Sequence, residues 1–146
     1  MELEVARERT EKLMRQWGLD GWRLEFDNAP VRAGVCYSYR RVIALSKPIT
    51  ELNEWEGMVE NTALHEIAHA LADPKAGHGP QWKAMALKVG ADPWRNYSPD
   101  MVVPPGTWQA TCQCPGTTYH RQHRPHANRR YRCPRCRTDL EYRRVR

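Results

Sequence analysis

His65-Glu66-Ile67-Ala68-His69 (HEIAH) is the most informative pentapeptide of this sequence. It lies within residues 54–72, where apolar side chains recur at spacings of three and four, the pattern of a long and largely buried helix. Residues i and i+4 of a helix lie about 40° apart around the axis and about 6 Å apart along it, so both imidazoles project from one face. Two ring nitrogens so placed can bind one Zn²⁺, with Glu66 beside the ion as the candidate general base.

The predicted helix has recognisable ends. Asn53 and Glu56 have the spacing of an N-terminal capping box, and Asp73-Pro74 stops the helix. Gly79-Pro80 then opens a second helix, which Gly90 ends. The sequence therefore predicts two consecutive helices joined by a short loop.

A catalytic zinc site needs a third protein ligand and an open coordination position. No glutamate lies between Glu66 and Glu141, which excludes a downstream glutamate ligand. His78 lies in the loop Ala76-Gly77-His78-Gly79-Pro80, whose glycines let the chain fold back onto the metal face. Asp73, at the end of the predicted helix, is the alternative ligand on geometry. We favour His78, because neutral imidazole is the commonest metal ligand.

The residues before this helix predict a helix and a small sheet. Residues 3–17 have apolar side chains at helical spacing, whereas residues 22–26 and 35–39 alternate between apolar and polar in the manner of strands. Residues 42–45 form a short apolar run. We expect a three-stranded antiparallel sheet, in which Cys36 is a small strand residue without a reactive role.

Composition and charge divide the chain near residue 106. The 146 residues include 40% hydrophobic and 27% charged side chains, which excludes a disordered chain, and no apolar run is long enough to span a membrane. The N-terminus lacks the apolar stretch of a secretory signal, so we expect a cytoplasmic protein, nucleoid-associated if bacterial, with no membrane partner. Residues 1–106 have a net charge of −2, whereas residues 107–146 contain ten Arg, no Lys and two acids, a net charge of +8.

Four of the five cysteines lie in this basic segment, namely Cys112, Cys114, Cys133 and Cys136. The segment has too few apolar residues to form a core unaided, and four thiolates on one structural Zn²⁺ would supply the missing stability. The spacing of one residue in C-x-C makes a tighter chelate than C-x-x-C. One of the first two cysteines is therefore open to replacement by a histidine: His120, His123 or His126.

Tyrosines lie among the arginines of the same segment, and this combination is typical of proteins that bind nucleic acid. Arginine makes bidentate contacts with phosphates, and aromatic rings stack on unpaired bases, so we expect single-stranded or junction DNA as the partner. The predicted contacts are Arg121, Arg124, Arg129, Arg130, Arg132 and Arg135.

Three motifs in order resemble the SprT-like metalloprotease family, which is related to the eukaryotic protease Spartan. The motifs are HEIAHAL at 65–71, GHGPQWKAMA at 77–86, and the pair of C-x-C and YRCPRC in the basic segment. The resemblance as a whole runs from about residue 4 to residue 142. The resemblance implies an α+β fold, with a zincin-like metalloprotease domain over residues 1–106 and a basic zinc ribbon over residues 107–146.

The resemblance also implies a function and its residues. His65, His69 and His78 would bind a catalytic Zn²⁺, the four cysteines a structural Zn²⁺, and Glu66 would be the general base. The expected activity is endopeptidase cleavage of DNA-associated or DNA-crosslinked proteins by a monomer, stimulated by DNA. Neither the residues nor the resemblance assigns a second oxyanion donor, and Tyr97 is a guess outside the predicted site.

Two other functions remain open. The charge division favours a zinc-stabilised nucleic-acid-binding protein whose HExxH site is not catalytic. A repressor-cleaving regulatory peptidase ranks last, because such enzymes usually take a downstream glutamate as the third zinc ligand.

Overall fold

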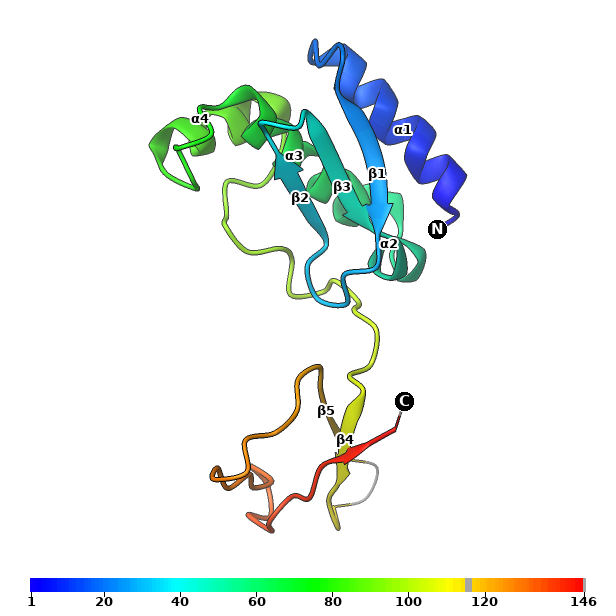
Figure 1. Ribbon diagram of the computed structural model, residues 1–146, viewed down its shortest axis with the longest axis vertical. Coiled ribbons are helices and arrows are strands. Elements are labelled where there is room, and N and C mark those ends of the chain that lie inside the picture. The colour runs from blue at the N-terminus through cyan, green and yellow to red at the C-terminus, as the bar shows by residue number, and fades with distance from the viewer. Residues whose placement is uncertain (115–116, 146) are drawn as a thin grey trace. The chain divides into compact units, whose positions relative to one another are not determined.

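The computed structural model describes residues 1–114 and 117–145, and the chain divides into two compact units, Met1–Pro104 and Pro105–Arg146. The N-terminal unit combines helices with a small sheet, and the described elements of the C-terminal unit are short strands, so the fold class is mixed α+β (Figure 1). No helix within the described ranges combines the length and the apolar character that crossing a membrane requires.

The N-terminal unit contains eight elements in the order helix, three strands and four helical segments. They are α1 (Leu3–Gln16), β1 (Arg23–Asp27), β2 (Gly34–Tyr37), β3 (Val42–Ser46), α2 (Lys47–Leu52), η1 (Trp55–Val59), α3 (Glu60–Leu71) and α4 (Pro80–Val89). The two helices predicted at residues 3–17 and after Gly79-Pro80 are confirmed, and Gly90 ends α4 in the left-handed conformation at φ 90°.

The sheet has the strand order β1-β3-β2, so the prediction of an antiparallel sheet is wrong in one pairing. β3 pairs antiparallel with β2 but parallel with β1, with Leu24 opposite Ile43. The alternation of apolar and polar residues along a strand reveals which face of the strand is buried but not which strand lies beside it. β1 and β2 are consecutive in the chain, but β3 lies between them in the sheet. The uninterrupted apolar run of β3 fits its central place, because every residue of this strand is buried.

The predicted helix over residues 54–72 is also wrong in its first turn. The backbone leaves helical geometry at Glu56 and Gly57, where Gly57 has φ 73°, and regular helix begins only at Glu60. Asn53 is therefore not an N-cap. Its Nδ2 atom donates to the carbonyls of Ile49 and Val102, both at 2.7 Å, and its Oδ1 atom accepts from Val102 N at 2.9 Å. The side chain ties residues 91–104 to the end of α2.

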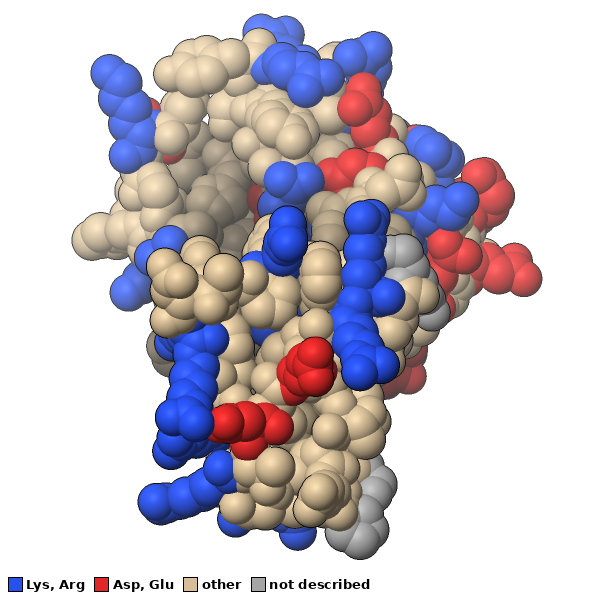
Figure 2. Space-filling model, turned by 60° about the horizontal axis from the view of Figure 1, so that its bottom comes forward, with Lys and Arg blue, Asp and Glu red and all other residues tan. Residues whose placement is uncertain are grey.

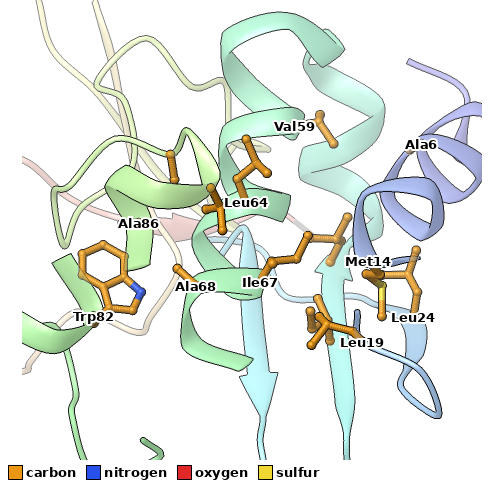
Figure 3. Close-up of a cluster of buried hydrophobic side chains, with 14 residues drawn as sticks. Ala6, Met14, Leu19, Leu24, Val59, Leu64, Ile67, Ala68, Trp82 and Ala86 are labelled. Carbon is orange, nitrogen blue, oxygen red and sulfur yellow. The ribbon is translucent and has the colours of Figure 1, made fainter. Parts of the chain in front are cut away.

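The hydrophobic core surrounds α3, which contributes Leu64, Ile67 and Ala68 (Figure 3). Trp82 and Ala86 of α4 pack against it, and Trp82 and Ile67 are fully buried. A fully buried apolar side chain of this size stabilises a fold by about 2–3 kcal/mol. The HEIAH pentapeptide is thus held on the best-packed helix of the unit.

The C-terminal unit is a three-stranded antiparallel sheet with few buried side chains. Its strands are β4 (Trp108–Thr111), β5 (Thr118–Arg121) and β6 (Arg143–Arg144), in the order β5-β4-β6. The buried apolar residues that the structure describes in it are Ala110, Cys112 and Cys133. Such a core is too small to stabilise the unit without a further cross-link.

Candidate metal centre and active site

Three imidazoles meet at one end of α3. His65 and His69 project from the same helix face, and His78 approaches from the turn before α4. The Nε2 atom of His78 lies 3.2 Å from that of His65 and 3.0 Å from that of His69. Nitrogens that share a tetrahedral Zn²⁺ at about 2.0–2.1 Å lie about 3.3–3.4 Å apart. The donor set therefore fits one Zn²⁺.

The turn between the helices places His78. Gly77 has φ 54°, a left-handed conformation that costs glycine little, and Gly79 N donates to Ala76 O at 3.0 Å. Asp73 stabilises the same turn, because its Oδ1 atom accepts from Lys75 N at 2.8 Å. Among the residues that the structure describes, the ligand atoms that gather here come from the three histidines, without Asp73.

Trp82 forms the wall behind the histidines. Its ring centroid lies 4.6 Å from that of His65, 5.2 Å from that of His69 and 4.7 Å from that of His78. Its indole N–H donates to the carbonyl of His65 at 3.4 Å. The sequence alone gives Trp82 no role at the metal centre. Its contact with all three imidazoles makes it a support of the metal centre as well.

Burial keeps the imidazoles neutral. Burial, with further contributions from the neighbouring His69 and His78, lowers the pKa of His65 to about 3. Burial, together with the charge of His78, lowers the pKa of His69 to about 4. A neutral imidazole is the form that binds a metal, so the site is prepared for an ion at neutral pH.

Glu66 lies beside the histidines and is 3% exposed. Burial raises the pKa of its carboxyl to about 8, against the opposing effects of the Tyr97 hydrogen bond and the Arg32 charge. The Tyr97 hydroxyl donates to Glu66 Oε1 at 3.2 Å. Tyr97, to which the sequence assigns no role, therefore contacts the candidate general base.

A cavity of about 360 Å³ opens onto these groups. One side is formed by the start of β2 and the residues around it, and another by the turn before α4. A third side is formed by residues 95–97, from the segment that follows α4. The lining includes Arg32, Gly34, Val35, Cys36, Ser38, His65, Glu66, His69, Asp73, Gly77, His78, Arg95 and Tyr97. The cavity gives a substrate access to the histidines and to Glu66 together.

The four cysteines of the C-terminal unit form a second candidate metal site. The Sγ atoms of Cys112, Cys114, Cys133 and Cys136 lie within 4.8 Å of one another. Sulfurs that share a tetrahedral Zn²⁺ at about 2.3 Å lie about 3.8 Å apart, so this set also fits zinc. His120, His123 and His126 are outside this group of ligand atoms in the described part of the chain.

Hydrogen bonds reach two of these sulfurs, those of Cys133 and Cys112. The Tyr119 hydroxyl lies 3.1 Å from Cys133 Sγ. This hydrogen bond, with one from the Cys136 backbone N–H, lowers the pKa of Cys133 to about 6. Cys114 N donates to Cys112 Sγ at 3.3 Å, which stabilises the tight C-x-C turn. The thiolate is the form that binds a metal.

The six arginines predicted to bind DNA differ in their surroundings. The guanidinium of Arg121 lies 4.8 Å from the ring centroid of Tyr131 and 5.9 Å from that of Tyr142, and its Nε atom is buried without a partner in the described residues. Arg130 and Arg132 pair with Asp139 at 3.0 and 3.3 Å. Arg121 is therefore half-buried against two tyrosine rings, whereas Arg130 and Arg132 are exposed and paired.

The other three are exposed, as Arg130 and Arg132 are, but do not pair with Asp139. Arg129 lies 5.7 Å from the Tyr131 ring centroid, and Arg124 and Arg135 project from the surface. Figure 2 shows basic side chains dispersed over the visible face, with acidic side chains between them.

Comparisons with known proteins bear on the N-terminal unit. A family model described as the SprT-like family matches residues 6–102. The match includes the three histidines and Glu66 and ends before the cysteine group. Neither the search of curated proteins nor the search of solved structures found a match.

Proposed function

The chain belongs to the SprT-like family, and from this premise we propose that it is a zinc-dependent endopeptidase that cleaves DNA-associated or DNA-crosslinked proteins and is stimulated by DNA. The family is of the zinc-metalloprotease type. The observation that carries the proposal is the meeting of three imidazoles, with His78 Nε2 3.2 Å from that of His65 and 3.0 Å from that of His69, beside a buried carboxyl group and a cavity. A structural zinc site is normally closed by four protein ligands, whereas this set of three leaves a position for water and substrate.

Glu66 would move the proton. Zn²⁺, when bound, polarises water and the scissile carbonyl. Glu66 accepts the proton of the attacking water and then passes it to the leaving amine, which restores the carboxylate. The apolar packing around α3 keeps this carboxyl out of bulk water and close to the cavity.

The edge of the sheet offers a place for the substrate backbone. β2 is an edge strand, and in its antiparallel pairing with β3 the backbone groups of Gly34 and Cys36 point away from β3. The backbone N–H and carbonyl of Gly34 form hydrogen bonds with the Tyr97 hydroxyl, and Cys36 lines the cavity. An extended peptide that pairs with Cys36 would lie along the same cavity as the histidines.

The C-terminal unit would supply the DNA contact. It holds ten of the arginines of the chain, and its exposed Arg124, Arg129 and Arg135 are suited to phosphate groups. Binding of the enzyme and of its protein substrate to one DNA molecule raises their effective concentration, which is the physical basis for stimulation by DNA.

The direct test is cleavage of a single-stranded-DNA-binding protein, with and without single-stranded DNA. We expect fragments that need both zinc and DNA, none after chelation, and none from Glu66→Gln with zinc still bound. Undiminished proteolysis by Glu66→Gln would refute the role of Glu66. Cleavage that is indifferent to DNA would leave a zinc peptidase without the DNA requirement.

The charge distribution favours one second candidate, a zinc-stabilised nucleic-acid-binding protein without catalysis. In that case the same experiment would give DNA binding and no fragments under any condition.

A further inference from the structure

We propose that Tyr97 is a positioning residue that orients Glu66 through its hydroxyl group. The proposal rests on the proposed peptidase function of the site. Tyr97 comes from residues 91–104, which follow α4 and lead to the second unit. Glu66 lies on α3, so the contact joins two parts of the chain that are 31 residues apart.

The Tyr97 hydroxyl makes three short contacts. It accepts from Gly34 N at 3.2 Å, and it faces two acceptors, Gly34 O at 3.0 Å and Glu66 Oε1 at 3.2 Å. A phenol has a single proton to donate. At any moment, then, the hydroxyl donates to the carboxylate or to the backbone carbonyl.

This arrangement satisfies Glu66 before and after it takes a proton. When Glu66 is a carboxylate, the Tyr97 hydroxyl donates to it. When Glu66 carries the proton taken from water on its other carboxyl oxygen, Oε1 still accepts from the Tyr97 hydroxyl, and the proton remains free to pass to the leaving amine. The carboxyl keeps one hydrogen-bond partner and one orientation through both steps.

Gly34 is the second part of the arrangement. A Cβ atom on Gly34 would lie 2.9 Å from Thr62 Cγ2 and 3.0 Å from Glu66 Cγ. The absence of a side chain therefore lets α3 approach β2 closely enough for Glu66 and Gly34 to share the Tyr97 hydroxyl. An alanine at this position would push Glu66 away.

Residues 91–104 are anchored on both sides of Tyr97. Asp92 N donates to Asn61 Oδ1 of α3 at 2.9 Å, and Val102 is held by Asn53 through two hydrogen bonds. Two anchors that are ten residues apart restrict the intervening chain and the place of the hydroxyl. This is what a positioning role requires.

The test is Tyr97→Phe, which removes the hydroxyl and keeps the ring. We expect kcat to fall about 10- to 100-fold while KM stays unchanged, a part of what general-base catalysis contributes. Zinc content and melting temperature should stay near those of the wild type. Gly34→Ala should lower kcat in the same way. The matched control is Tyr39→Phe, because Tyr39 is 86% exposed.

A second readout does not depend on activity. Gly34 N–H donates to the Tyr97 oxygen, so its hydrogen exchange, measured by NMR, should become at least about ten times faster in Tyr97→Phe and stay unchanged in Tyr39→Phe. Wild-type protein that cleaves nothing would refute the proposed function, and the exchange experiment would still test the Gly34 contact.

Three outcomes would overturn the proposal. Unchanged kcat in Tyr97→Phe would show that the hydroxyl does not orient the base. A raised KM at constant kcat would make Tyr97 a substrate contact. A loss of zinc and of melting temperature together with kcat would make its role structural.

Discussion

The indole ring of Trp82 lies stacked on the imidazole of His69, with centroids 5.2 Å apart and an interplanar angle of 26°. Trp82 is fully buried, and its N–H bonds the carbonyl of His65. One side chain thus belongs both to the hydrophobic core and to the wall of the metal centre. Core stability and metal affinity should therefore change together when it is altered.

Trp82→Phe should reveal this coupling. We expect the free energy of unfolding to fall by about 1–3 kcal/mol, because the smaller ring leaves a void and removes the hydrogen bond to His65. Zinc affinity should fall about 10-fold, because the imidazoles lose their support. Chemical denaturation of the metal-free protein and chelator competition measure the two effects. Trp94→Phe is the control, because Trp94 is 66% exposed, and an equal loss in both variants would contradict the assignment.

His78→Ala should remove one of two zinc ions. The wild-type chain is expected to bind one ion at the three histidines and one at the four cysteines. Removing His78 leaves two nitrogens, too few for a stable site, so metal analysis of the purified variant should give about one ion per chain. His126→Ala is the matched control and should keep both ions. Two ions in His78→Ala would mean that another ligand completes the first site.

The metal-free protein should lose stability as pH rises, through Glu66. The pKa of this group is about 8 in the folded state against an ordinary value of 4.5. A raised pKa contributes stability that is complete below pH 4.5 and is lost as pH rises through 8. The melting temperature of the metal-free wild type, relative to metal-free Glu66→Gln, should therefore fall between pH 5 and pH 8. A difference in melting temperature that stays constant from pH 5 to pH 8 would show that the Glu66 carboxyl is ionised over this whole range.

DNA affinity should depend on Arg124 and Arg135 more than on Arg130 and Arg132, which pair with Asp139. Arg124→Ala combined with Arg135→Ala should weaken binding to single-stranded DNA and reduce the slope of log affinity against log salt by about 1.4, the share of two phosphate contacts. The control pair is Arg130→Ala with Arg132→Ala, whose charges Asp139 partly neutralises. Fluorescence anisotropy at several salt concentrations measures both slopes. A larger effect in the control pair would place the DNA at Arg130 and Arg132.

Local patterns in the sequence predicted that His65, His69 and His78 would lie close together, as they do. The spacing of His65 and His69 places them on one helix face whatever the rest of the fold does, and the glycines around His78 allow the return of the chain. These are short-range consequences of helix geometry. The family resemblance assigned the same roles to His78 and Glu66, and the match over residues 6–102 shows the family membership.

The failures concern relationships that no local pattern encodes. The parallel pairing of β1 with β3 depends on which strand enters the middle of the sheet, and alternation does not reveal this. Gly57 takes a left-handed conformation and delays the start of α3, although apolar periodicity continues through it. The contact of Tyr97 with Glu66 and Gly34 joins three distant segments, so only the folded chain reveals it.

The two units should respond differently to chelation. The core around α3 does not depend on metal, so the emptied N-terminal unit should remain folded and refill quickly when zinc returns. The C-terminal unit has Ala110, Cys112 and Cys133 as its described buried apolar residues, and should unravel once its thiols are released. Recovery after chelation should then be biphasic: zinc binding by the three histidines returns first, and DNA-stimulated cleavage returns only as the cysteine-bearing unit refolds.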